Sequence, residues 1–181
     1  MDLRVITPPT VEPVTLTEAK AFLRVDGTAE DTLITSLIVA ARERGEELSR
    51  RAFLTQTLEM TVDSWPSQRT LALLRPPLIS VTSVTYRDYY GVSAVWTDYR
   101  TDANSQPGKI IFISKPGTLL QESGAVTIRY VAGYGSAASA VPERIKSAIL
   151  ALVAHWFEMR MVGDVPDGIK QAFLGERVVW F

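Results

Sequence analysis

The sequence predicts an α+β protein in which helices from both ends of the chain form one helical core around an inserted small antiparallel β unit. The hydrophobic pattern has a helical period near both ends of the chain, whereas in between it breaks into short alternating runs separated by turn residues. Neither helical segment can bury its apolar face alone, so we expect the two ends to pack together. The predicted parts are residues 1–54 (N-terminal arm and helices), 55–134 (β unit) and 135–181 (C-terminal helices and tail).

The N-terminal helices are predicted from their starts. The first dozen residues are rich in proline and are expected to be extended. Thr15 and Glu18 have the spacing of a capping box, which predicts a short helix. The sequence TAED, residues 28–31, predicts a second helix capped by Asp31. Gly45 lies on the apolar stripe of that helix, which indicates a close helix–helix approach, because glycine otherwise destabilises a helix.

The β unit is predicted from short runs rich in β-branched and aromatic residues. These runs are LEMTVDSW, LALL, ISVTSVTYRD, VSAVWTDYR, KIIFIS and AVTIRYVAGY. The intervening RPP, YYG, NSQPG and KPG contain the residues that turns favour. Short turns between successive strands predict antiparallel pairing.

Two helices are predicted after the β unit, over residues 141–160 and 169–174. On a helical wheel, the large apolar side chains of the first helix lie within about 60° of Ile149 and face the core. The opposite side carries small and polar residues, and we call this set the small-residue stripe: Ser147, Ala151, Ala154 and Glu158, with His155 at its margin. A solvent-facing side is normally more polar, so we predict that the stripe packs against another element or a neighbouring subunit.

Composition excludes several classes of protein. Hydrophobic residues make up 46% and charged residues 22%, as in ordinary globular proteins. The net charge of -1 leaves no basic footprint for DNA or an anionic membrane. There is no cysteine, which excludes disulfides and thiolate metal sites. The longest apolar run is shorter than the roughly 20 residues of a membrane span, so we expect a soluble protein without membrane contact.

The residues predict no catalytic, cofactor or metal site. Phosphate-binding glycine loops and a GxSxG element are missing from the sequence. His155 is the only histidine, and together with Glu158 it does not make a metal site. We therefore predict that the chain is not an enzyme and that His155 is a packing and hydrogen-bonding residue. A hydrolase centred on His155 stays open as a third hypothesis.

An alternative function is a nucleic-acid-binding module that uses the β unit. Aromatic residues and arginines interleave there, as they do in stacking platforms for single strands, although packed strands also favour aromatics. The residues are Tyr86, Arg87, Tyr89, Tyr90, Trp96, Tyr99 and Arg100.

Several short motifs, in this order along the chain, resemble one known family. They are TLTEAKAFLRVD followed by ED, RPPLISVTSV, RYVAGY and VPERIKSAILALVAHWFE. In this combination the chain resembles the head–tail connector proteins of tailed bacteriophages, also called adaptor or head-completion proteins, which occur in gene transfer agents as well. His155 falls inside the last motif and so belongs to the family pattern.

The resemblance implies a structural adaptor of the phage neck, without enzymatic activity or cofactor. It implies a homo-oligomeric ring of about a dozen copies under the portal protein, although an isolated chain can stay monomeric. The ring would extend the DNA channel and join the head to the next tail or neck component. DNA would pass through without sequence-specific binding. The expected location is the virion neck, assembled in the cytoplasm of a bacterial host.

The resemblance also implies that the C-terminal tail docks on the portal. The tail comprises Arg177, Val178, Val179, Trp180 and Phe181. An extended, aromatic and β-branched terminus can add to a sheet or fill a groove of a partner. It can equally fold back onto its own β unit, and the sequence leaves both alternatives open.

Overall fold

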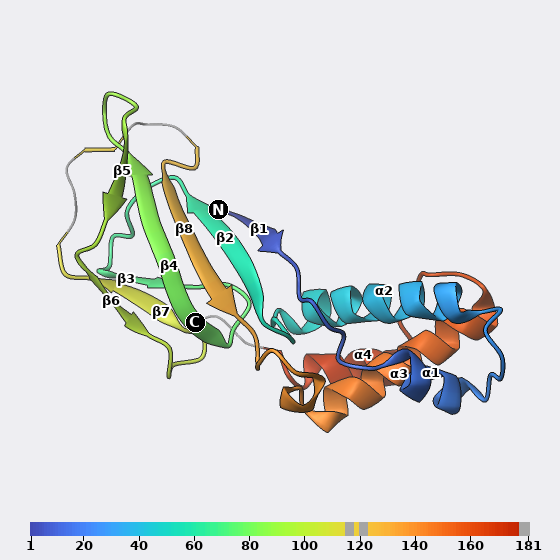
Figure 1. Ribbon diagram of the computed structural model, residues 1–181. Helices are drawn as coiled ribbons and strands as arrows, with labels where there is room; N and C mark the ends of the chain where they lie inside the picture. The colour runs from blue at the N-terminus through green and yellow to red at the C-terminus, as the bar shows by residue number, and fades with distance from the viewer. Residues whose placement is uncertain (115–117, 120–122, 178–181) are drawn as a thin grey trace. The chain divides into compact units, whose positions relative to one another are not determined.

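The computed structural model describes the 181-residue chain except for residues 115–117, 120–122 and 178–181. The chain divides into two compact units (Figure 1). Within the described residues, the β unit comprises Met1–Pro8 and Thr55–Gly133, and the helical unit comprises Pro9–Leu54 and residues 134–177. The described residues contain helices and antiparallel sheets, so the prediction of an α+β protein is confirmed.

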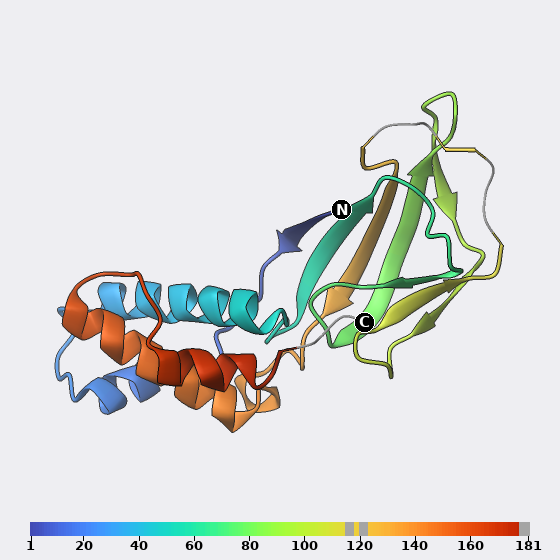
Figure 2. The ribbon, with the colours of Figure 1, turned by 180° about the vertical axis from the view of Figure 1, so that it is seen from behind.

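Four α-helices and one short 3-10 helix make up the described part of the helical unit (Figure 2). They are α1 (Leu16–Leu23), α2 (Asp31–Ser49), η1 (Ala138–Ala140), α3 (Glu143–Met159) and α4 (Asp167–Leu174). Helices from before and after the β unit contact one another: α2 packs on both α3 and α4, and α1 packs on α2 and α3. The two ends of the chain therefore share one core, as the hydrophobic pattern predicts.

The starts of α1 and α2 are stabilised differently. At α1 the capping box is confirmed, because the Thr15 hydroxyl accepts from the Glu18 N–H and the Glu18 carboxylate accepts from the Thr15 N–H. These bonds to the backbone and side chain of Thr15 lower the pKa of Glu18. At α2 the predicted cap is wrong: Asp31 is the first helical residue, Glu30 is at the cap position, and no side chain caps the helix. The Asp31 carboxylate instead accepts from Lys20 Nζ at 2.6 Å, which joins α1 to α2.

Gly45 marks a close approach between side chains and backbone in the helical core. A Cβ atom built on it would lie 2.6 Å from a ring carbon of Phe173 in α4 and 2.8 Å from one of Phe53. The Phe53 and Phe173 rings are fully buried and stacked, with centroids 6.2 Å apart. The close approach predicted at Gly45 is therefore confirmed.

A buried cation connects three segments of the helical unit. The Arg42 side chain is 6% exposed and donates from Nε to Glu12 at 2.8 Å and from Nη1 to Glu46 at 3.2 Å. The second oxygen of the Glu46 carboxylate accepts from the backbone N–H of Phe53 at 2.8 Å. The segment before α1, the middle of α2 and the segment after α2 are thus joined by one charge network.

The β unit contains a five-stranded and a three-stranded antiparallel sheet within the described residues. The larger sheet has the order β1-β2-β8-β4-β5, and the smaller has the order β3-β7-β6. The strands are β1 (Asp2–Thr7), β2 (Gln56–Val62), β3 (Thr70–Ala72), β4 (Leu78–Arg87), β5 (Ser93–Trp96), β6 (Tyr99–Asp102), β7 (Lys109–Phe112) and β8 (Val126–Ala132). β2 alternates strictly between buried and half-buried residues, as expected of a strand with one face in a core.

Two predictions for the strands need correction. The N-terminal residues, assigned from sequence to the arm of the helical part, form β1, which pairs with β2 from Asp2 opposite Thr61 to Thr7 opposite Thr57. Most of β1 is exposed, so its side chains carry little of the apolar alternation that identifies a strand. The segment VSAVWTDYR, predicted as one strand, is two: β5 pairs with β4, whereas β6 pairs with β7 in the other sheet.

Tyr130 is the largest fully buried side chain of the β unit. It lies on β8, and its hydroxyl donates to the carbonyl of Leu74 at 2.7 Å, which satisfies the only polar atom of the side chain. Burial raises the pKa of this phenol. The hydrogen bond holds the segment after β3 against the central strand of the larger sheet.

We predict that Glu46→Ala lowers the free energy of unfolding of the helical unit by about 1–3 kcal/mol, because it removes one of the carboxylates bound to the buried Arg42 and takes the acceptor from the buried N–H of Phe53. Hydrogen exchange of the α2 and α3 amides measures this change. Glu47→Ala is the control: it removes an exposed pair with Arg44, which is worth about 0–1 kcal/mol. Equal protection in the two variants would contradict a central role for the buried pair.

We predict that Gly45→Ala also destabilises the helical unit, by about 1–2 kcal/mol, although alanine is the better helix former. The added methyl group would displace two packed phenylalanine rings. The matched control is Gly168→Ala in α4, where a Cβ meets no atom within 4 Å and no positive φ is involved. Thermal unfolding should separate the two, and an unchanged or raised Tm for Gly45→Ala would refute the prediction.

Candidate functional site

The helix α3 has two unlike sides. The side predicted to face the core does so: Ile145, Ile149, Leu152, Val153 and Trp156 are all at most 2% exposed. The Trp156 indole donates to the carbonyl of Asp164 at 3.3 Å, which ties the end of α3 to the segment that leads into α4. These contacts fix the rotation of α3 about its axis and hence the direction of its other side.

The small-residue stripe lies on the outward side of α3. Ser147 and Glu158 are exposed, and Ala151, Ala154 and His155 are half-buried. The structure therefore brings the five predicted residues together on one helix face. The small side chains of Ser147, Ala151 and Ala154 allow a neighbouring surface to approach the backbone of α3.

His155 makes no hydrogen bond or ion pair within the described part of the chain. We expected from the sequence that His155 would form a hydrogen bond. Within the described residues of one chain, it forms none. Among the same residues, no three histidine, aspartate or glutamate side chains come together in a group that could hold a metal ion.

Of the C-terminal tail, Arg177 belongs to the described residues. Arg177 is exposed, and its N–H donates to the carbonyl of Leu174 at 3.0 Å, just after α4. The predicted docking residues Val178, Val179, Trp180 and Phe181 lie outside the described residues.

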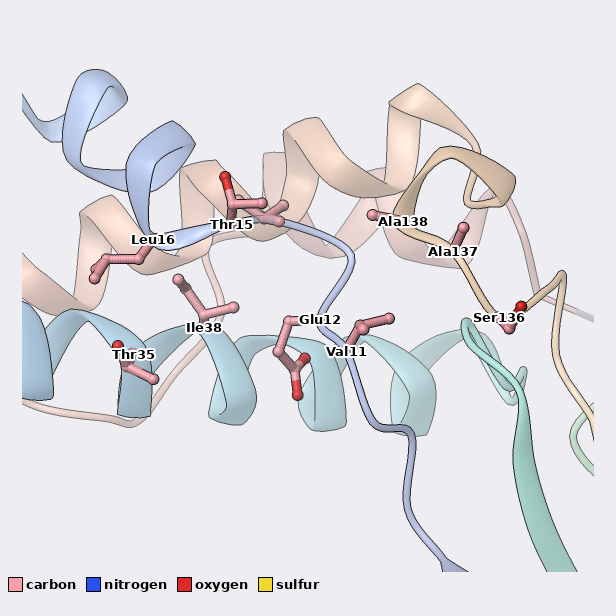
Figure 3. Close-up of a pocket in the computed structure, with 10 residues that line it drawn as sticks. Val11, Glu12, Thr15, Leu16, Thr35, Ile38, Ser136, Ala137 and Ala138 are labelled. Atoms are coloured by element: carbon pink, nitrogen blue, oxygen red, sulfur yellow. The ribbon is translucent and has the colours of Figure 1, made fainter.

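A groove that the sequence does not reveal lies beside α2 (Figure 3). It has a volume of about 480 Å³, and its lining residues come from the segment before α1, from α2 and from the residues before α3. Most of its lining is apolar: the buried Val14 and Ile38 contribute to it, and so do Val11, Leu16 and Ala137. We call this feature the apolar groove.

Glu12 connects the apolar groove to the buried charge network. Glu12 lines the groove, and one oxygen of its carboxylate accepts from Arg42. Its other oxygen forms no hydrogen bond within the described residues. The side chain is 24% exposed, so the groove offers an acceptor that a hydroxyl or amide could reach. The only sequence signal for this site is the pair of valines, Val11 and Val14, among the prolines of the N-terminal segment.

The aromatic residues of the β unit do not form one stacking surface. Tyr86 and Trp96 pack edge to face at 6.2 Å, and both contact Trp65, which also lies against the buried Phe112. Tyr89 and Tyr90 instead lie in the turn between β4 and β5, where they are 64% and 85% exposed. The aromatic set proposed for nucleic-acid stacking is therefore divided between a packed cluster and an exposed turn.

The sequence model of one protein family, described as "Head completion protein", matches residues 12–173. The chain belongs to this family. The resemblance to head–tail connector proteins is thereby confirmed, and the family places a structural protein at the head–tail interface of a virion. The matched region includes the small-residue stripe and the lining of the apolar groove except Val11, while the tail from Arg177 onward lies beyond it.

Solved structures show that the fold of this head completion protein recurs in gene transfer agent (GTA) particles. One matching chain comes from the neck of an empty GTA particle with C6 symmetry, at a TM-score of 0.84 and 23% identity. Another comes from the virion of a native GTA particle, at 0.81 and 23%, and a third from the neck of a native particle with C12 symmetry, at 0.77 and 22%. Each match covers 100% of this chain and 97% of the other. None of the curated proteins compared with the chain matches it.

Within the described ranges, none of the helices combines the length and the apolar character that crossing a membrane requires.

We predict that His155→Gln leaves the stability of the helical unit within about 0.5 kcal/mol of the parent chain and leaves head completion intact, because His155 is half-buried and unpaired within the described residues. Trp156→Ala is the neighbouring control and should lose about 3–5 kcal/mol, because Trp156 is buried. Thermal unfolding and the yield of DNA-filled particles give the two measurements. A folded His155→Gln chain that fails to complete heads would contradict the prediction and show that the imidazole is needed for function.

Proposed function

We propose that this head completion protein is a structural adaptor of the neck that forms a ring under the portal, extends the DNA channel and joins the head to the tail. The observation that carries the proposal is the family match over residues 12–173 together with a fold shared along the whole chain with neck proteins. The C6 and C12 symmetry of those necks supports an assembly of several copies around an axis. In this role the protein acts by contact and carries out no reaction.

We further propose that the small-residue stripe of α3 is one surface through which copies meet. Contacts between successive copies of a ring are heterologous, so each copy needs two different matching surfaces. The half-buried Ala151 and Ala154 allow close approach of another backbone, and the stripe faces away from the core of its own unit. The next neck or tail component would bind the assembled ring.

We propose that the tail Arg177–Phe181 docks on the portal protein. Four of its five residues are apolar or aromatic, which suits a groove or a sheet edge of a partner. DNA would pass through the ring without sequence-specific binding. The near-neutral charge of the chain supports passage, because a strongly basic lumen would retain the phosphates.

A deletion experiment tests the adaptor function. Particles assembled without this chain should release their DNA and fail to join tails, and complementation with the parent chain should restore both. Electron microscopy counts tailed particles, and nuclease protection measures the retained DNA. Tailed and DNA-filled particles formed in the absence of the chain would overturn the proposal.

We predict that Ala151→Glu folds normally but reduces the yield of tailed particles at least about tenfold, because a contact between copies would bury an unpaired charge that costs more than 1.4 kcal/mol. Gln171→Glu adds the same charge at an exposed position of α4 and should leave the yield unchanged. Complementation of the deletion with each variant gives the yields. Equal yields would remove the stripe from the proposed interface.

A further inference from the structure

The turn between β4 and β5 presents apolar side chains to solvent. We define the tip as Asp88–Val92, which includes Tyr89, Tyr90 and Val92, with exposed fractions of 64%, 85% and 60%. The two tyrosine rings pack edge to face with centroids 5.4 Å apart. Scattered exposed apolar residues are common, but three within five residues form a patch that suits a partner.

The tip is held rigidly by its own hydrogen bonds. The Asp88 carboxylate accepts from the N–H groups of Tyr90 and Val92, each at 2.9 Å. The Asp88 N–H donates to the Val92 carbonyl at 3.0 Å, and the Gly91 N–H donates to the Asp88 carbonyl at 2.9 Å. Gly91 has a φ of 80°, which a glycine adopts without strain. The tyrosines are therefore presented on an ordered turn, and docking them needs little further ordering.

The charges around the tip favour a protein partner over a nucleic acid. Asp88 is the only charged residue within the tip, and it is an anion. The preceding Arg87 donates to the carbonyl of Ser123 at 3.5 Å. A strand of nucleic acid needs cations beside the stacking rings, whereas protein interfaces are enriched in tyrosine.

The apolar groove is a suitable receptor for the tip. Its volume of about 480 Å³ lies in the range of sites that enclose small ligands, about 300–1,000 Å³, so it can accept an aromatic side chain. The lining is apolar apart from hydroxyl groups and Glu12. A tyrosine matches this arrangement, because its ring can contact Val11, Val14 and Ile38 while its hydroxyl donates to the free oxygen of Glu12.

We propose that the tip of one copy docks in the apolar groove of a second copy. The inference rests on the proposed ring, and it names a pair of surfaces through which neighbouring copies would meet. Tip and groove are different surfaces carried by every copy, which is the requirement for a heterologous contact that repeats around an axis. The contact is complementary in polarity: the uncharged rings meet a mainly apolar lining, and a hydroxyl donor meets the carboxylate acceptor of Glu12.

Engineered cysteines test the contact, because the chain has none of its own. Tyr90→Cys in the tip is combined with Val11→Cys in the groove, both exposed positions at which a cysteine leaves the core intact. Particles carrying the double variant are treated with a short bismaleimide and analysed by denaturing electrophoresis. We expect a ladder of dimers and higher oligomers. The control pairs Tyr90→Cys with Gln171→Cys, an exposed α4 position outside the groove, and should give no ladder.

Three outcomes would count against the docking. The first is a ladder of equal strength from the control pair. The second is the absence of a ladder from the double variant in particles where glutaraldehyde still links copies of the chain. The latter result leaves the proposed ring intact, whereas absence of oligomers with both reagents overturns the ring itself. Finally, a salt-sensitive DNA affinity that Tyr89→Ser with Tyr90→Ser abolishes would assign the tip to nucleic acid instead.

Discussion

The helical unit depends on one buried cation. Arg42 lies on α2 among apolar side chains, and its charge is tolerated because Glu12 and Glu46 surround the guanidinium group. Glu46 also accepts from the N–H of Phe53, so the charge network sets the direction in which the chain leaves α2 toward the β unit. Glu12 is held over α2 by the same cation, which fixes the segment that lines the apolar groove. The segment before α1, helix α2 and the segment that follows it are thus connected through one buried charge.

The two sides of α3 serve different purposes, one in folding and the other in assembly. Its large residues complete the core with α2, while its small residues stay at the surface of the unit. Burial of the first side supplies most of the hydrophobic stabilisation that a helix of this length can provide, at about 25 cal/mol per Å² of apolar surface. The second side adds little to the stability of a single chain. A sequence that keeps it small is therefore better explained by contact with another surface than by folding.

The sequence predicts those features that periodicity and capping determine. The α3 core residues, the Thr15–Glu18 box and the close approach at Gly45 each have a local signature, and the structure has all three. The cap predicted at Asp31 was wrong and the strand β1 was missed because long-range partners decide both: Asp31 pairs with Lys20, and β1 is held mainly by backbone bonds to β2. The apolar groove was missed for the same reason, since its lining comes from segments far apart in the chain. The function was inferred from the order of the family motifs in the sequence and not from a catalytic or binding site.

The path of the chain has a consequence for its resistance to proteolysis. Within the described residues, the backbone passes between the two units at residues 8–9, 54–55 and 133–134. A single cut at 54–55 would leave two fragments, but each unit would still contain parts of both. The fragments would stay associated through the pairing of β1 with β2 and the packing of α2 on α3. A protease can therefore cut the chain once at this junction between the units, and the two fragments would remain one folded molecule.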